Sequence, residues 1–365
     1  MLGNTQENTS ELKNKISNSD SIYFNKELLN EIDSDLSIGH YGFIDHIMIY
    51  KDETLIFDRG YNQSYDVISE SYDTIGNQYN YYSPKWHPYL DKSNLHTLQS
   101  ATKSITSLLI GILIEKGYLE GLNLKILPIL GFERTNTLKD DITIMDLLTM
   151  RGGIKWDEST VPYTNELNNC AEMERLENWV DYILSQPMES VPGQDFNYNG
   201  GLTVLLGKII EIKSGMRLDK FAEKYLFHPL GIKKYFWKRS PSGEYDTEGG
   251  LYLTIHDFAK FGFLIKNNGE FRGKQIVSKN WIKRSLSSIS TVDQYHSYGF
   301  QWWIFNFENP KCEIKFAGGY GDQFIFWNKK KNILIIIMGW NIFKNKVKYT
   351  IRYDLPLLIY ENLDK

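Results

Sequence analysis

Strand-like segments lie at both ends of this chain, and helical segments fill the middle. Runs rich in β-branched and aromatic residues occur at 43–50, 54–59, 299–305, 313–317, 323–327 and 333–338. Apolar residues at helical spacing occur at 104–116, 141–150, 172–186, 202–214, 218–226, 255–266 and 353–362. Because strands and helices do not alternate, a doubly wound parallel sheet is disfavoured. The order predicts an α+β fold, in which one antiparallel sheet built from both chain ends is flanked by helices and carries an inserted helical lobe.

The predicted domain follows a polar extension. Residues 1–35 are polar, with one short helix expected at 26–36. We expect a single domain over 36–365, with sheet regions at about 40–100 and 290–365 and the helical lobe at about 120–250. The stretch 60–94 is rich in Tyr, Ser, Asn and Asp, which is typical of a long surface excursion.

Composition and charge exclude several classes of protein. The 365 residues carry a net charge of −4, so no basic excess favours binding to nucleic acid or to an anionic membrane. The longest apolar runs are too short to span a bilayer, and the polar stretch 1–20 shows no signal-peptide pattern. As written, the chain is expected in the cytoplasm, or in the periplasm or outside the cell if a signal was removed. No pattern indicates an oligomeric state.

The sequence lacks the common motifs of metal and nucleotide chemistry. It contains no H-E-x-x-H, no P-loop, no G-x-S-x-G and no C-x-x-C, and Cys170 and Cys312 lie far apart. The seven histidines are scattered, so each is interpreted as a structural or surface residue. We therefore expect no metal and no organic cofactor, and two buried, unreactive thiols.

A Ser and a Lys three residues apart stand where a polar loop meets the most apolar helical segment. Ser100 and Lys103 would share one helix face, and the unpaired N–H of a first-turn Ser suits an oxyanion hole. Burial should lower the pKa of Lys103, so that its amine can take the Ser100 proton. The spacing alone is weak, since Ser10 and Lys13 repeat it. The alternative is a helix N-cap at Ser100 with a solvated Lys103.

Two glycine-rich segments carry further candidates. Residues 192–201 precede an apolar helix and contain Tyr198, which could relay a proton if a cation lowered its pKa. Residues 316–323 interrupt a strand with glycines, which marks a bulge or a close backbone approach, and an N–H there could complete an oxyanion hole. The alternatives are a buried structural Tyr198 and a simple turn.

Two pairs of adjacent residues are assigned no catalytic role. Asp157 and Glu158, which follow Trp156, are interpreted as a solvated loop rather than as substrate contacts. Trp302 and Trp303 are interpreted as packing residues, because aromatic side chains dominate protein cores.

Taken together, these segments resemble the serine β-lactamase-related superfamily. This group includes class C β-lactamases, DD-peptidases and the esterases and amidases of that fold, among them the 6-aminohexanoate-dimer hydrolases. The resemblance covers about 40–365 and rests on the S-x-x-K segment at 96–107, an I-T-I…L-L-T…G-G segment at 142–153, the Tyr motif at 192–198, and similar stretches at 249–262 and 298–303. It implies a β-lactamase/transpeptidase-like fold and a serine hydrolase that resembles an esterase, an amidase or a penicillin-binding protein.

Residue by residue, the resemblance implies that Ser100 is the nucleophile and that Lys103 and Tyr198 act as its bases. It implies an oxyanion hole formed by the backbone N–H groups of Ser100 and Tyr320. The further candidates for binding substrate are Ala317, Gly318, Gly319 and Asn199.

The chain departs from the family pattern in two places. The family's Y-x-N reads Tyr198-Asn199-Gly200, and its K-T-G or H-x-G reads Ala317-Gly318-Gly319. The cation that helps to hold a substrate carboxylate in β-lactamases and DD-peptidases is therefore missing. We expect a hydrolase of a small-molecule ester or amide that acts through an acyl-enzyme. The alternatives are a true β-lactamase or DD-peptidase-type penicillin-binding protein, and a non-catalytic binding or sensor protein of the same fold.

Overall fold

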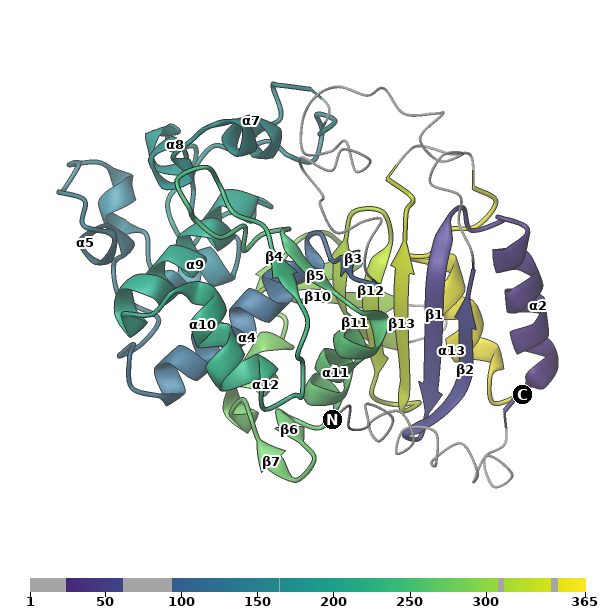
Figure 1. The fold of residues 1–365 in the computed structure, drawn as a ribbon. Helices are drawn as coiled ribbons and strands as arrows, with labels where there is room; N and C mark the ends of the chain where they lie inside the picture. Colours follow the sequence, from purple (N-terminus) through teal and green to yellow (C-terminus); the bar gives the residue numbers. More distant parts are fainter. Residues whose placement is uncertain (1–23, 62–93, 164, 308–311, 343–346) are drawn as a thin grey trace, which may run out of the picture.

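An eight-stranded antiparallel sheet forms one half of the molecule. The computed structural model describes residues 24–61, 94–163, 165–307, 312–342 and 347–365. The strands of the sheet are β1 (Ile44–Lys51), β2 (Thr54–Gly60), β8 (Ser290–Thr291), β9 (His296–Tyr298), β10 (Trp303–Phe307), β11 (Cys312–Gly319), β12 (Gln323–Asn328) and β13 (Ile333–Gly339). Their order is β2-β1-β13-β12-β11-β10-β9-β8, so the N-terminal hairpin pairs with the last strand of the chain (Figure 1).

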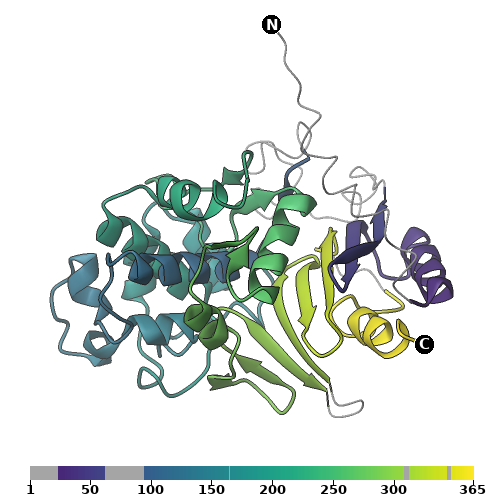
Figure 2. The same ribbon diagram turned by 90° about the horizontal axis from the view of Figure 1, so that it is seen from below.

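Helices form the other half and also cover the sheet (Figures 1 and 2). The helices are α2 (Lys26–Ser37), α4 (Ala101–Glu115), α5 (Ile126–Leu130), α6 (Ile144–Leu148), α7 (Asn169–Arg175), α8 (Trp179–Ser185), α9 (Gly200–Ser214), α10 (Leu218–Ala222), α11 (Ile255–Lys266), α12 (Lys279–Ser285) and α13 (Asp354–Asn362). A short 3₁₀-helix, η2 (Leu138–Asp141), and a short π-helix, η3 (Glu223–Phe227), complete the lobe. Two small sheets join β3 (His96–Thr97), β5 (Leu251–Leu253) and β4 (Phe236–Trp237), and β6 (Glu270–Phe271) with β7 (Lys274–Gln275).

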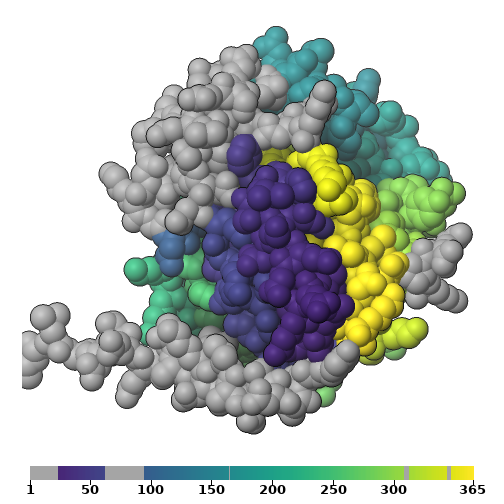
Figure 3. Space-filling view, turned by 90° about the vertical axis from the view of Figure 1, so that its right-hand side faces the viewer, coloured from purple at the N-terminus to yellow at the C-terminus, as the bar shows by residue number. Residues whose placement is uncertain are grey.

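Both faces of the main sheet are buried. Because successive side chains of a strand point to opposite faces, β13 contributes Leu334, Ile336 and Met338 to the core shared with α4 and α11. Its other face contributes Ile333, Ile335 and Ile337 to a second core, which α2 and α13 close. Figure 3 shows α2 and the first hairpin, in purple, directly beside the C-terminal segment in yellow. The two ends of the chain therefore stabilise the same layer.

The predicted α+β architecture is confirmed, and two predicted elements need correction. The helix expected at 172–186 is two helices, because the chain is extended at Leu176 and α8 starts anew after Asn178. The strand expected at 299–305 begins only at Trp303, because Gln301 has a left-handed φ of 62°. The predicted excursion lies mostly outside the described residues, and the proposed subdivision of the chain stays a prediction. Among the helices that the structure describes, none has the length and apolarity needed to cross a bilayer.

Candidate active site

A sharp turn presents Ser100 at the start of the most buried helix. Gln99, between β3 and α4, has a left-handed φ of 47°, which few residues other than Gly adopt. Ser100 occupies the N-cap position of α4, but its side chain makes no capping hydrogen bond. The N-cap alternative for the Ser100 hydroxyl is therefore wrong, and the hydroxyl is available for another partner.

Lys103 is that partner. Its ammonium nitrogen, Nζ, lies 2.9 Å from Ser100 Oγ and also donates to the backbone oxygen of Glu248 at 3.1 Å. The side chain is 1% exposed, because residues 101–113 of α4 are buried on all sides. The alternative of a solvated Lys103 is therefore wrong as well.

Tyr198 contacts the same hydroxyl. Its phenol forms a side-chain hydrogen bond with Ser100, and Lys103 Nζ lies 5.0 Å from the centre of its ring. The loop that carries it is held by Asn197, which donates to the backbone oxygens of Met150 at 2.8 Å and Trp156 at 3.0 Å. Trp303 stacks on the Tyr198 ring at 5.6 Å between centroids. The three predicted side chains therefore meet at one point.

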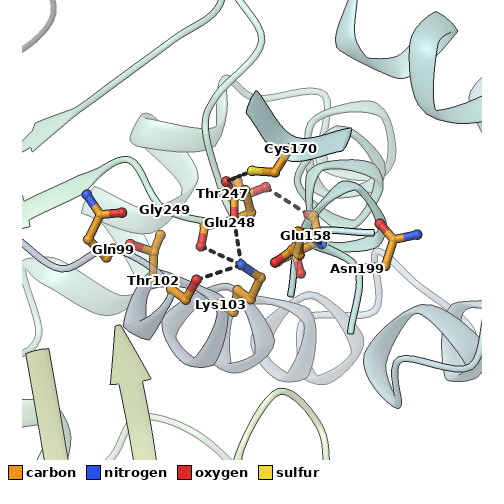
Figure 4. Close-up of polar contacts among 12 residues, drawn as sticks. Gln99, Thr102, Lys103, Glu158, Cys170, Asn199, Thr247, Glu248 and Gly249 are labelled. Atoms are coloured by element: carbon orange, nitrogen blue, oxygen red, sulfur yellow. Dashed lines mark hydrogen bonds and ion pairs between the residues drawn. The ribbon is translucent and has the colours of Figure 1, made fainter. Parts of the chain in front are cut away.

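Two buried carboxylates complete the surroundings of Lys103, and the sequence interpretation missed both roles. Glu248, 4% exposed, forms a short ion pair with the Lys103 ammonium through Oε2 and accepts a hydrogen bond from the Cys170 thiol through Oε1 at 2.9 Å. Glu158 Oε2 accepts from Trp156 Nε1 and from the Gly200 N–H, both at 2.7 Å. Figure 4 shows Lys103 on its helix, with Glu248 above it and Cys170 beyond Glu248.

The exposure of these acidic side chains corrects one expectation. Glu158 was expected in a solvated loop, yet it is 3% exposed and turned inward, whereas Asp157 remains partly exposed and bonds to Ser159, Thr160 and Asn169. The signal was present in the sequence, since a Trp two residues before a carboxylate offers an indole N–H donor. A single pair of this kind does not distinguish a buried loop from an exposed one.

The protonation state of Lys103 also differs from the expectation. Burial disfavours its ammonium form, but the attraction of Glu248, followed by that of Tyr198 and Glu158, raises the pKa of Lys103 well above its usual range. The predicted lowering was wrong, because the anion that compensates burial comes from a distant part of the chain. Lys103 therefore rests as an ammonium ion.

The neighbouring groups divide into charged and neutral forms. Burial raises the pKa of Glu158 to about 7. For Glu248, burial acts in the same direction, but Lys103 and the Cys170 thiol outweigh it and lower the pKa. Burial raises the pKa of Tyr198, against the opposing attraction of Lys103, so its phenol rests protonated. At neutral pH the stable arrangement is the Lys103–Glu248 ion pair beside a neutral phenol.

The end of β11 lies against the turn that carries Ser100. Ala317, 1% exposed, pairs with Ile325, and Gly318 and Gly319 continue the ladder to Phe324 and Gln323. The strand ends there, and Tyr320 is 39% exposed, with its phenol donating to the backbone oxygen of Ile342 at 2.7 Å. A Cβ at Gly319 would lie 2.2 Å from the Leu98 backbone oxygen and 3.0 Å from the Gln99 Cβ, so the strand end lies beside the turn where the oxyanion hole is predicted.

Asn199 and Gly200 stand where the sequence departs from the family pattern. Asn199 is 1% exposed and caps α9, since its side-chain oxygen accepts from the Leu202 N–H at 3.2 Å. A Cβ at Gly200 would lie 2.8 Å from Glu248 Oε2 and 3.0 Å from Glu158 Oε2. The space that a side chain at 200 would fill is therefore already taken by the two carboxylates.

One cluster of metal-ligand type lies next to the site. Donor atoms of Cys170, Glu174 and Glu248 all fall within 4.8 Å of one another. Both carboxylates already have a cationic partner within the chain, since Glu174 pairs with Lys238 and Glu248 with Lys103. The cluster is accordingly a neutralised network of ion pairs.

Comparisons with known proteins identify the family that the chain resembles. A family model described as Beta-lactamase matches residues 47–354. A 6-aminohexanoate-dimer hydrolase of Paenarthrobacter ureafaciens is 20% identical over 269 residues, which cover 67% of this chain and 66% of that protein. A protein of Alkalihalophilus pseudofirmus is 25% identical over 148 residues, covering 34% of this chain and 44% of the relative. The chain thus spans less than two thirds of the length of these curated relatives.

Solved structures show the same fold at low identity. An octameric penicillin-binding protein homologue from Pyrococcus abyssi has a TM-score of 0.62 at 21% identity, covering 92% of this chain and 77% of that one. EstCE1, described as a hydrolase with promiscuous acyltransferase activity, has a TM-score of 0.65 at 13% identity, covering 98% and 99%. These likenesses show a β-lactamase/transpeptidase-like fold.

Proposed function

This chain belongs to the beta-lactamase family, and from that premise we propose that it is a serine hydrolase that cleaves an ester or amide through an acyl-enzyme at Ser100. The observation that carries the proposal is the position of the Ser100 hydroxyl. It lies 2.9 Å from Lys103 Nζ, makes a hydrogen bond with Tyr198, and stands at the head of a buried helix. An uncapped hydroxyl with two proton-exchanging partners is the arrangement of an activated nucleophile.

The proposed reaction has two halves. In acylation, Ser100 Oγ bonds to the substrate carbonyl carbon while its proton leaves through Lys103 and Tyr198, and the N–H groups of Ser100 and Tyr320 hold the oxyanion. The bond to the leaving group then breaks, and the leaving group takes a proton from the same network. In deacylation, water attacks the acyl carbon and restores Ser100. No step in this scheme calls for a metal or an organic cofactor.

The residues at the end of β11 bear on the class of substrate. Residues 317–319 are Ala-Gly-Gly, so this position has no cation for a substrate carboxylate. One curated relative is named a 6-aminohexanoate-dimer hydrolase, and EstCE1 is described as a hydrolase with promiscuous acyltransferase activity. We therefore favour a small ester or amide over a β-lactam or a peptidoglycan peptide.

Hydrolysis of p-nitrophenyl acetate tests the proposal. Ser100→Ala should lower kcat/KM by about 10²-fold or more, as loss of a nucleophile does. Ser107→Ala is the matched control, because its hydroxyl is buried in the same helix without a hydrogen-bond partner among the described residues. Equal rates for wild type and Ser100→Ala would refute the proposal. A chromogenic cephalosporin hydrolysed faster than the ester would favour a β-lactamase, and no turnover of either would favour a binding protein.

A further inference from the structure

The resting state of the site poses a problem for the proposed chemistry. Lys103 Nζ lies between Ser100 Oγ, at 2.9 Å, and the carboxylate of Glu248, with which it forms a short ion pair. An ammonium ion already carries all the protons that a lysine can hold, so it cannot accept another from Ser100. A base in this position needs a place for one of its own protons.

We propose that Glu248 is a positioning residue that receives a proton from Lys103 while Lys103 receives the proton of Ser100. The inference rests on the proposed function, in which Ser100 is the nucleophile. Glu248 is the one carboxylate among the described residues that makes an ion pair with Lys103. The order of contact, hydroxyl to amine to carboxylate, is therefore a continuous path for protons.

The surroundings of Glu248 suit this role. The side chain is 4% exposed, and its second oxygen is held by the Cys170 thiol at 2.9 Å. Its loop is fixed by Asp246, which accepts from the Gly249 N–H at 2.8 Å. Burial disfavours both charged forms, so it reduces the free-energy difference between the ion pair and the neutral pair of amine and carboxylic acid.

Among the described residues, no hydrogen bond or ion pair joins Glu158 to Lys103, so Glu158 does not continue this path. Its Oε2 is already engaged by Trp156 and the Gly200 N–H, and burial raises its pKa to about 7, so it is partly neutral at neutral pH. The remaining titratable groups around the pair come from several elements. They are Tyr198 before α9, Cys170 and Glu174 on α7, Lys238 and Asp246 from the segment after β4, and Tyr163.

The proposed proton transfer conserves atoms and charge. Ser100 Oγ forms a bond to the carbonyl carbon, its proton passes to Lys103 Nζ, and Lys103 passes one proton to Glu248 Oε2. Lys103 stays an ammonium ion, Glu248 becomes a neutral acid, and the negative charge moves to the substrate oxygen. When the intermediate collapses, the bond to the leaving group breaks, the leaving group takes a proton from Lys103 through the Tyr198 phenol, and Lys103 recovers it from Glu248.

The pH dependence of Glu248→Gln separates this role from a merely structural one. Glutamine keeps the shape but cannot take up the proton, so acylation then requires a Lys103 amine that is already neutral. Without the Glu248 charge, burial lowers the pKa of Lys103, and the amine becomes available as the pH rises. At about pH 6, kcat/KM for p-nitrophenyl acetate should fall by about 10²-fold, within the range for general acid–base catalysis. Towards about pH 9.5 the ratio of wild type to variant should shrink at least about tenfold.

Two further variants serve as controls for this experiment. Glu174→Gln removes another buried carboxylate of the same network, one that pairs with Lys238 rather than Lys103. Any effect of this variant on the rate should be the same at every pH. Glu248→Asp keeps a proton acceptor, so the ratio of wild type to this variant should stay nearly constant with pH. This variant tests the inference if Glu248→Gln does not fold. A ratio for Glu248→Gln that stays constant with pH, or one for Glu248→Asp that changes steeply, overturns the inference. If Ser100→Ala keeps wild-type activity, the proposed function itself fails, whatever the Glu248 variants show.

Discussion

Gly319 packs so closely against Leu98 that a Cβ at position 319 would lie 2.2 Å from the Leu98 backbone oxygen. This approach joins the end of β11 to the turn that presents Ser100. Only a glycine permits it, since real Cβ atoms do not come that near to a carbonyl oxygen.

Gly319→Ala should therefore separate the two backbones and lower ester hydrolysis strongly, with a loss of stability of about 1–3 kcal/mol. Gly262→Ala, on α11, is the matched control, because its Cβ would meet the Leu334 side chain at 2.8 Å rather than a backbone oxygen. Steady-state kinetics and thermal unfolding of both variants check this. Full activity in Gly319→Ala would contradict the close docking of the strand on the turn.

Tyr198→Phe removes the phenol that contacts Ser100 while the ring keeps its stack on Trp303. We expect kcat/KM for the ester to fall by about 10²-fold with little change in Tm, because a proton relay is lost but packing is not. Tyr298→Phe serves as the control, since that ring packs edge-on against Tyr198 at 6.4 Å. A loss as large in Tyr298→Phe as in Tyr198→Phe would argue for packing rather than proton transfer.

Gly200 and Glu248 should be energetically coupled. Gly200→Ala places a Cβ 2.8 Å from Glu248 Oε2 and should displace the carboxylate from Lys103, lowering the rate. Glu248→Asp shortens the side chain and makes room, so the double variant should lose less than the sum of the two single effects. A double-mutant cycle on kcat/KM and on unfolding free energy measures this coupling. Strict additivity would mean that the two residues do not compete for the same space.

Glu158 should make the folded state less stable at high pH. Its pKa is about 7 in the fold, against 4.5 for a free carboxyl, so the native state binds the proton more tightly than the unfolded state. The unfolding free energy contributed by Glu158 is therefore full below about pH 4.5 and falls as the pH rises to about 7. Glu158→Gln keeps an oxygen for Trp156 and Gly200 and removes this loss.

Denaturant unfolding at about pH 5 and pH 8 checks the sign. The unfolding free energy of Glu158→Gln, taken relative to wild type, should rise by on the order of 2 kcal/mol when the pH is raised from about 5 to about 8. Comparing the same variant pair at each pH cancels the contributions of Asp246 and Glu174, which are also buried and titrate in both proteins. If the relative unfolding free energy of Glu158→Gln rose on lowering the pH instead, the native state would favour the ionised form of Glu158.

Much of this fold follows from local patterns in the sequence. The strands near both chain ends and the apolar helix after Ser100 are strong periodic signals, and they carry most of the architecture. The break between α7 and α8 was missed because Leu176 continues the helical pattern in sequence but is extended in the structure.

The candidate site was predictable only in part. Ser100, Lys103 and Tyr198 come together as the motifs predicted, although their chemical roles stay predictions. Glu248 was missed because a lone carboxylate before two glycines has no local signature. Its effect on Lys103 arises only when residues far apart in the sequence meet in a buried space, and this also explains why the predicted direction of the Lys103 pKa was wrong.

The most direct measurement is peptide mapping by mass spectrometry after treatment with a fluorophosphonate probe. We predict one adduct on the peptide that contains Ser100 in the wild type and in Ser107→Ala, and none in Ser100→Ala. An unmodified Ser100 after prolonged treatment of the folded protein, or an adduct confined to another residue, would contradict the account.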